Sequence, residues 1–313
     1  MTGTVLFFAL LSCVRILDKP KSNPMIERIS SETILLTKDY HEKQHNYLWI
    51  SDLHLDSIHC ERELLKQHLD QALDINATIF IVGDLFDVMA SYGDRRLLRE
   101  DVDPLFIRRG ESYLDLVVDY AVDYLKPYAK NIAMISKGNH EDTISQFHNT
   151  DILARVVGAM NGSGARIMQG GYRGYLVTRY QRTKTSHATV IHHYHHGYGG
   201  SAKRSFGVLD VQMEAMKYPD AQYLIRGHTH QKWLVPSVTR QRLNKKSGKT
   251  KDEHVKYIQM GAYKHTNSET DGWEVKRNFN PTKLGGWFIE HHMARGGINH
   301  NTVYIKDKIY EAE

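Results

Sequence analysis

The chain has 313 residues, of which 41% are hydrophobic and 25% are charged, a composition typical of one large or two small globular domains with a substantial core. It contains no repeat or low-complexity segment, which excludes repeat architectures. The formal charge of +5 agrees with an anionic substrate, but it is too small to establish nucleic-acid binding.

The cysteines and the N-terminal segment bear on where the protein is located. Cys13 and Cys60 are the only cysteines, so a disulfide framework is excluded and a reduced, cytoplasmic location is predicted. The apolar stretch Val5–Val14 has the length of a signal-peptide core, but no Lys or Arg precedes it and it is too short to span a bilayer. The alternatives for residues 1–20 are export, lipid anchoring at the imperfect lipoprotein box Leu10–Cys13, and a packed strand. No other long apolar segment is present, so no transmembrane span is predicted.

Strands and helices are predicted to alternate through the first half of the chain. Apolar residues at helical spacing indicate two helices, and Pro127 ends the second of them. Such alternation is typical of a parallel α/β core. The predicted parts are an N-terminal extension with a first strand (1–44, strand Ile34–Leu36), a main domain (45–313) and helices over Cys60–Ile75 and Leu114–Leu125.

The second half is predicted as a helix, a hairpin, another helix and C-terminal strands. These elements are Ile152–Met160, Arg166–Tyr180, Phe206–Tyr218, Lys256–Met260, Gly286–Glu290 and Thr302–Ile305. Two connections stand out. Val88–Gly110 is long enough to be a functional lid, with a solvated charged loop as the alternative, and Arg240–Lys251 is a basic, polar loop.

One strand end places a carboxylate where a ligand site is expected. Ala77–Val82 is apolar and too short for most helices, which predicts a strand covered on both faces. Gly83 ends this strand and Asp84 follows it. Ligands of open α/β sheets bind outside the carboxyl ends of the strands. Taken alone, such an ending is usually a turn, so the neighbouring motifs decide its meaning.

Four other apolar runs end in residues that can hold a metal ion. They are Tyr47–Ile50 before Ser51–His54, Ile132–Ile135 before Gly138–Glu141, Ala188–Ile191 before His192–Gly197, and Tyr223–Ile225 before Gly227–His230. Carboxylates suit hard divalent cations and imidazole admits iron, zinc and manganese, so this set without thiolates indicates such metals. Alternate residues of an extended segment face the same way, which predicts that Asp52 and His54 converge on one ion and that His228 and His230 reach a common site.

The order D-x-H, GD-x-x-D, GNHE, a His-rich strand end and GHTH resembles the calcineurin-like metallophosphoesterase family from about Tyr47 to Gln231. Small single-domain members of this kind are frequent in phage and bacteria. The resemblance implies an α/β fold, a two-sheet sandwich flanked by helices with the metals at the strand ends. It also implies two divalent metal ions, manganese first and iron, zinc or nickel as alternatives, and hydrolysis of phosphate esters by attack of metal-bound hydroxide.

The same resemblance assigns roles to individual residues. The implied metal ligands are Asp52, His54 and His230 at the first ion, Asn139, His228 and one histidine of Ile191–Gly197 at the second, and Asp84 as the bridge. Among the clustered histidines the family pattern favours His195, with His196 as the close alternative.

The resemblance implies further roles around these ligands. His140 is implied as the general acid of catalysis, with a hydrogen-bonded structural residue as the alternative. Asp87 is implied to orient a neighbouring side chain. His59 and Asp56 follow the first motif and are candidates for the substrate mouth or for a surface role.

The expected activity is hydrolysis of a phosphate ester, with nucleic acid among the candidate substrates. A phosphodiesterase or nuclease is favoured by basic residues beside the proposed site, namely Arg95, Arg96, Arg108, Arg109 and the 240–251 loop. A phosphomonoesterase, including a protein phosphatase, would use the same metals. The alternative from another class is a catalytically inactive, metal-stabilised binding module. The sequence indicates no oligomeric state.

Overall fold

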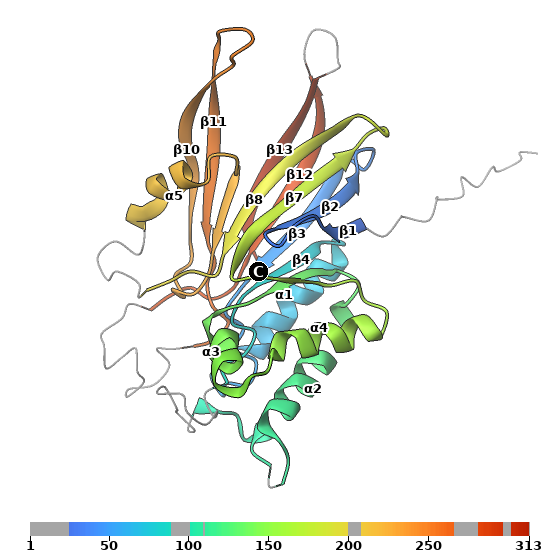
Figure 1. The fold of residues 1–313 in the computed structure, drawn as a ribbon, viewed down its shortest axis with the longest axis vertical. Coiled ribbons are helices and arrows are strands. Elements are labelled where there is room, and N and C mark those ends of the chain that lie inside the picture. The colour runs from blue at the N-terminus through green and yellow to red at the C-terminus, as the bar shows by residue number, and fades with distance from the viewer. Residues whose placement is uncertain are drawn as a thin grey trace, which may run out of the picture.

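The computed structural model describes residues 25–88, 101–108, 110–199, 208–265, 281–296 and 302–312. The described strands form two mixed sheets that face each other at the centre of the molecule, with helices on the outer faces (Figure 1). This is the predicted α/β sandwich of two sheets flanked by helices, and that prediction is confirmed.

The first sheet has six strands in the order β13-β12-β3-β4-β5-β6. Neighbouring strands from β3 to β6 run parallel, and β12 joins them antiparallel to β3. All five residues of β4 are buried, because the sheet is covered on both faces. The strands are β3 (Gln44–Ile50), β4 (Thr78–Val82), β5 (Ile132–Ser136), β6 (Met168–Gly170), β12 (Trp287–Gly296) and β13 (Thr302–Glu311).

The second sheet has seven strands in the order β1-β2-β7-β8-β9-β11-β10. Its centre is parallel, because β8, β9 and β11 run in the same direction. The strands are β1 (Met25–Arg28), β2 (Thr33–Asp39), β7 (Arg173–Gln181), β8 (His187–His195), β9 (Tyr223–Arg226), β10 (Trp233–Leu243) and β11 (Thr250–Gln259). Residues before position 45 therefore contribute two strands to this sheet. The division into 1–44 and 45–313 stays a prediction.

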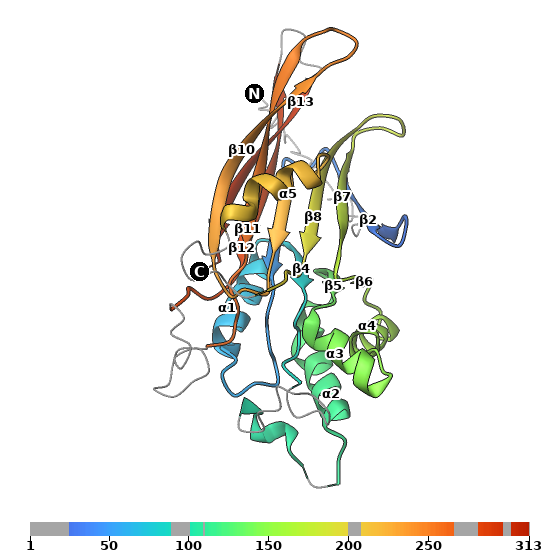
Figure 2. The same cartoon turned by 60° about the vertical axis from the view of Figure 1, so that its left-hand side comes forward.

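An apolar layer fills the space between the sheets. It includes Trp49 and Phe80 of the first sheet, whose stacked rings lie 4.4 Å apart, and Tyr194 of the second. A second apolar cluster lies under the helices that cover the six-stranded sheet, and a third lies between α5 and the seven-stranded sheet (Figure 2). The helices are α1 (Arg62–Asp74), α2 (Tyr113–Leu125), α3 (Asn139–His148), α4 (Ile152–Gly162) and α5 (Val211–Lys217).

Three local predictions differ from the structure. The segment Arg166–Tyr180 is not a hairpin, because β6 pairs in one sheet and β7 in the other, so the turn between them crosses the sandwich. Only the middle of Arg240–Lys251 is a loop, because its two ends belong to β10 and β11, which form a long antiparallel hairpin (Figure 1). Helix α3 was not predicted, although Glu141 three residues after Gly138 is a signal for a helix start.

The proposed lid can be followed only in part. Residues 101–108 hold a short 3-10 turn at Pro104–Phe106, and the buried Phe106 ring packs edge-on against Tyr120 of α2 at 5.1 Å. Arg95, Arg96, Arg109 and the N-terminal segment 1–20 lie outside the described residues. Within the described ranges, no helix combines the length and the apolar character needed to cross a membrane.

Candidate metal centre

The candidate site lies where strands of both sheets end. The loops after β3, β4 and β5 come from the six-stranded sheet, and those after β8 and β9 come from the seven-stranded sheet. Parallel strands bring their carboxyl ends to one edge, so motifs far apart in the sequence meet there. In the described part of the chain, three groups of histidine and carboxylate side chains have ligand atoms within 4.8 Å of one another, and all three lie at this edge.

The first group joins the motif after β3 to the motif after β9. It consists of Asp52, His54 and His230, with His230 Nε2 lying 3.6 Å from Asp52 Oδ1. Asp52 and His54 are buried, and His230 is partly exposed. The three residues that the resemblance implied for one metal ion therefore lie together.

The second group joins the loops after β4, β8 and β9. It consists of Asp84, His196 and His228. His196 Nε2 lies 3.0 Å from Asp84 Oδ2 and 3.0 Å from Asn139 Oδ1, so the amide oxygen belongs to the same cluster. His196 Nε2 also lies 4.0 Å from Asp52 Oδ1, which places the two groups side by side.

The structure places His196, and not His195, at the centre of the site. His195 is the last residue of β8, and its Nδ1 accepts a hydrogen bond from the amide N–H of Gly197. His195 belongs to none of the three groups, whereas His196 is fully buried beside Asp84. The regular alternation of side chains stops where the strand stops, so the next residue turns inward. We therefore revise the proposed ligand from His195 to His196.

The backbone at the site adopts conformations that side chains other than glycine rarely take. In the described part of the chain eight non-glycine residues have a positive φ, and five of them are proposed ligands with φ between 45° and 70°: Asp52, His54, Asp84, His228 and His230. Left-handed turns, and not the predicted extended segments, bring these side chains together. Such conformations cost free energy and concentrate at functional sites.

Glu141 connects the loops that follow β4 and β5. Its carboxylate accepts hydrogen bonds from the amides of Gly138 at 2.8 Å, Phe86 at 3.1 Å and Asp84 at 3.2 Å. Burial, reinforced by the charge of Asp84, raises the pKa of Glu141 to about 7. Gly138 has no room for a side chain, because a Cβ there would collide with the carboxylate and amide of Asp84. Sequence reasoning gave Glu141 no role in the site.

Asp87 and His140 form the third group together with His54. Asp87 Oδ1 lies 3.0 Å from His54 Nδ1, beside the imidazole that we expect it to orient. Lys264 Nζ donates to Asp87 Oδ2 at 2.8 Å, a contact that no motif in the sequence signals. His140 Nδ1 lies 2.5 Å from the carbonyl oxygen of Asp87. Since a carbonyl only accepts, Nδ1 carries the proton and Nε2 is the nitrogen on the side of Asp84, 3.8 Å from its Oδ2.

The remaining candidates lie outside the cluster. Asp56 is fully buried, and its carboxylate accepts from the amides of Asp87 at 2.5 Å and Val88 at 2.8 Å and from the Tyr113 hydroxyl. It therefore stabilises the loop after β4 and does not line a mouth. His59 belongs to none of the three groups, and its Nε2 lies 3.5 Å from Asp101.

Buried carboxylates give the site a strong local negative charge. Although burial opposes ionisation, the nearby imidazoles of His230 and His196 lower the pKa of Asp52 to about 2. Burial likewise disfavours a charged imidazole, yet the nearby Asp84 raises the pKa of His196 to about 10. The two carboxylates thus favour positive charge at this position, and a bound metal ion would supply such a charge.

Comparison with models of protein families identifies the family of the chain. The model of the calcineurin-like phosphoesterase family matches residues 45–232, more than half of the chain, and includes every residue of the two ligand groups. The chain belongs to the calcineurin-like phosphoesterase family. The resemblance drawn from the five motifs is thereby confirmed. No curated protein matches the chain by sequence.

Solved structures similar to this calcineurin-like phosphoesterase are remote in sequence. A protein described as a predicted phosphoesterase from Streptococcus pneumoniae is 13% identical, over 86% of this chain and 98% of that chain, with a TM-score of 0.31. The calcineurin-like phosphoesterase YfkN from Bacillus subtilis is 13% identical, over 86% and 91%, with a TM-score of 0.36. Vps29 from Chaetomium thermophilum is 11% identical, over 86% and 98%, with a TM-score of 0.35.

The residues at this site fit a pair of divalent metal ions. Both ring nitrogens of His54 are buried without a hydrogen-bond partner among the described residues, so Nε2 is available to coordinate an ion. Its other nitrogen faces Asp87, the arrangement that commonly orients a metal-binding imidazole. Imidazole, carboxylate and amide donors without thiolate suit manganese, iron, zinc or nickel.

A matched pair of substitutions tests the revised histidine. His196→Asn is expected to lower the metal content of the loaded protein by about one ion per chain, because it removes a donor shared with Asp84 and Asn139. His195→Asn is expected to leave the metal content unchanged. Elemental analysis of both purified variants measures this difference. Metal loss in the His195 variant alone would restore the original assignment.

Proposed function

We propose that the chain is a dinuclear-metal-dependent phosphoesterase with a phosphodiester as its preferred substrate. The observation that supports this proposal most is the contact between the two ligand groups, where His196 Nε2 of the second lies 4.0 Å from Asp52 Oδ1 of the first. Ligand sets this close can hold two ions about 3.5–4 Å apart, the spacing of two-metal phosphoryl-transfer sites.

We assign the ligands as two sets with one shared carboxylate. Asp52, His54 and His230 hold the first ion, and Asn139, His196 and His228 hold the second, with Asp84 between them. When bound, the ions supply Lewis-acid polarisation of the phosphoryl group and activation of a water molecule. Manganese is the first candidate, with iron, zinc or nickel as alternatives. The protein contributes fixed geometry, since five of these seven residues sit in constrained left-handed backbone.

The hydrogen bonds of His140 support a role in moving a proton to the leaving oxygen. Its Nδ1–H donates to the carbonyl of Asp87, which holds the ring so that Nε2 lies on the side of Asp84. Its own amide N–H also donates to Asp84 Oδ1 at 3.1 Å, so ring and ligand form one unit. In the protonated form, Nε2–H is the proton available to a departing alkoxide. We propose that His140 is the general acid.

The basic residues that favoured nucleic acid are partly neutralised within the protein. Arg240 and Arg242 pair with Glu253 at 3.2 and 2.9 Å, and Arg108 lies 3.8 Å from Glu111. The turn between β10 and β11 is also remote, because β11 ends beside the site and its ten residues span roughly 30 Å. We therefore propose that the substrate is a small phosphodiester and not a long nucleic acid.

The test compares three substrate classes on manganese-loaded protein. We expect turnover of bis-p-nitrophenyl phosphate that exceeds turnover of the p-nitrophenyl monoester and of a short oligonucleotide panel. A faster monoester reaction would favour a phosphomonoesterase, and cleavage of the oligonucleotides would favour a nuclease. No turnover of any substrate by protein that holds two metals would favour a metal-stabilised binding module.

Metal content is the first quantity to measure. We expect close to two transition-metal ions per chain in metal-replete protein, because the two ligand groups lie side by side. A ligand that binds only the folded state stabilises it by about 2.7 kcal/mol at a hundredfold excess over its Kd, so manganese should raise the melting temperature. Elemental analysis and thermal unfolding check both effects. A single zinc ion, or none after manganese loading, would contradict the dinuclear arrangement.

A further inference from the structure

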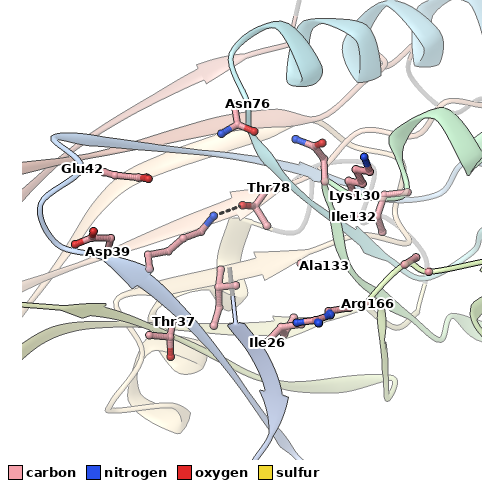
Figure 3. Close-up of a pocket in the computed structure, with 15 residues that line it drawn as sticks. Ile26, Thr37, Asp39, Glu42, Asn76, Thr78, Lys130, Ile132, Ala133 and Arg166 are labelled. Carbon is pink, nitrogen blue, oxygen red and sulfur yellow. Dashed lines mark hydrogen bonds between the residues drawn. The ribbon is translucent and has the colours of Figure 1, made fainter. Parts of the chain in front are cut away.

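A cavity of about 280 Å³ is drawn in Figure 3. It lies at the opposite end of the sheets from the metal centre. Its wall includes Thr78 and Ile132, the first residues of β4 and β5, whereas the last residues of these strands lead into the metal site. Five-residue strands separate the two ends by roughly 15 Å. The cavity also takes residues from β1 and β2, so it reaches from one sheet to the other.

Lys38 lines this cavity and forms no ion pair with any carboxylate that the structure describes. Lys38 Nζ donates to the Thr78 hydroxyl oxygen at 2.7 Å, and no ion pair of this ammonium is found within the described ranges. Burial lowers the pKa of Lys38 to about 8, although the charge of Glu42 acts in the opposite direction. Lys38 is partly buried, and a bound anion would supply the counterion that no described ion pair gives it.

The cavity has basic side chains at one end and acidic side chains at the other. Lys130 and Arg166 lie at one end, both exposed, and neither has an ion pair in the part of the chain that the structure describes (Figure 3). Asp39 and Glu42 lie at the other end. The Asp39 carboxylate accepts from the amide of His41 at 2.8 Å, and the Glu42 carboxylate lies 3.4 Å from His45 Nδ1. Apolar side chains also line the cavity, among them Ile26, Leu36, Ile132 and Ala133.

We propose that this cavity binds a small organic anion that also carries hydroxyl or amino donors. Its phosphate or carboxylate group lies between Lys38, Lys130 and Arg166, which together supply several N–H donors. Its donors face Asp39 and Glu42, and its apolar part covers the aliphatic wall. The volume approaches that of small-molecule sites, which begin at about 300 Å³. This site does not depend on the proposed phosphoesterase activity.

Calorimetry on the full, metal-loaded chain tests the site. The probes are adenosine monophosphate, which combines a phosphate with ribose hydroxyls, and glutamate, which combines carboxylates with an ammonium group. Lys38→Met removes the buried charge, Arg166→Gln removes an exposed one, and Lys246→Met on the exposed β10–β11 turn is the matched control. We expect one binding event per chain, for at least one probe, that both cavity variants weaken at least tenfold and the control does not change.

Several results would overturn the proposal. No saturable binding of either probe would do so, and so would equal binding by wild type and both cavity variants, which would place the ligand at the metal centre. Arg166 is exposed, so its substitution should not disturb folding. The Arg166 variant therefore still tests the proposal if Lys38→Met fails to fold. Activity on the nitrophenyl diester should be unchanged in both variants, because neither residue touches the metal site. The preferred probe distinguishes a phosphate ligand from a carboxylate ligand.

Discussion

Replacing Asp84 with asparagine is expected to remove both metal ions and to lower kcat/KM by at least about a thousandfold, equivalent to about 4 kcal/mol of transition-state stabilisation. Asp84 Oδ2 lies 3.0 Å from His196 Nε2, and its Oδ1 accepts from the amide of His140. Asparagine preserves the shape of the side chain but removes the negative charge that we propose two cations share. Elemental analysis and steady-state kinetics on the purified variant measure both effects.

The matched control is Asp87→Asn. Asp87 contacts His54 Nδ1 and Lys264 Nζ, and we place it beside a ligand without assigning it to an ion. This variant should keep most of its metal while losing part of its activity, because His54 is less firmly oriented. Equal loss of metal in the two variants would show that the bridging role has been given to the wrong carboxylate.

The second large effect is expected from His140→Asn. If His140 protonates the leaving oxygen, turnover of an alkyl or nucleotide ester should fall by about 10²–10⁴-fold, the usual contribution of a general acid. The metal content should remain near normal, since the contact of His140 with Asp84 Oδ1 is made by its backbone N–H. Kinetics and elemental analysis of the same preparation separate chemistry from metal binding.

The choice of substrate makes this test specific. Nitrophenolate leaves readily without a proton, whereas an alkoxide does not, so the defect of His140→Asn should be much smaller on bis-p-nitrophenyl phosphate. Wild type and variant are therefore compared on both substrates. An equal defect on both would assign His140 to positioning the phosphoryl group or a ligand, and would remove the general-acid role.

Local patterns predicted the strands better than the way the chain connects them. The apolar run before Gly83 is observed as β4, and Pro127 follows the end of α2 as expected. The pattern around Gln169–Gly171 predicted two strands, but β6 (Met168–Gly170) overlaps the expected turn and belongs to a different sheet from β7. Hydrophobic periodicity reports which residues are buried, and it does not report which partner a strand pairs with.

The sequence by itself determined the family, the α/β sandwich and the set of residue types available for metals, because strand-end motifs carry their chemistry locally. Only the tertiary structure decided that His196 replaces His195 beside Asp84, since that depends on where β8 ends and how the chain turns after it. It alone also brought Lys264 to Asp87, because a contact between residues 177 positions apart follows from the packing of the whole fold. The left-handed backbone of the proposed ligands has the same origin, as surrounding packing must hold a conformation that isolated residues disfavour.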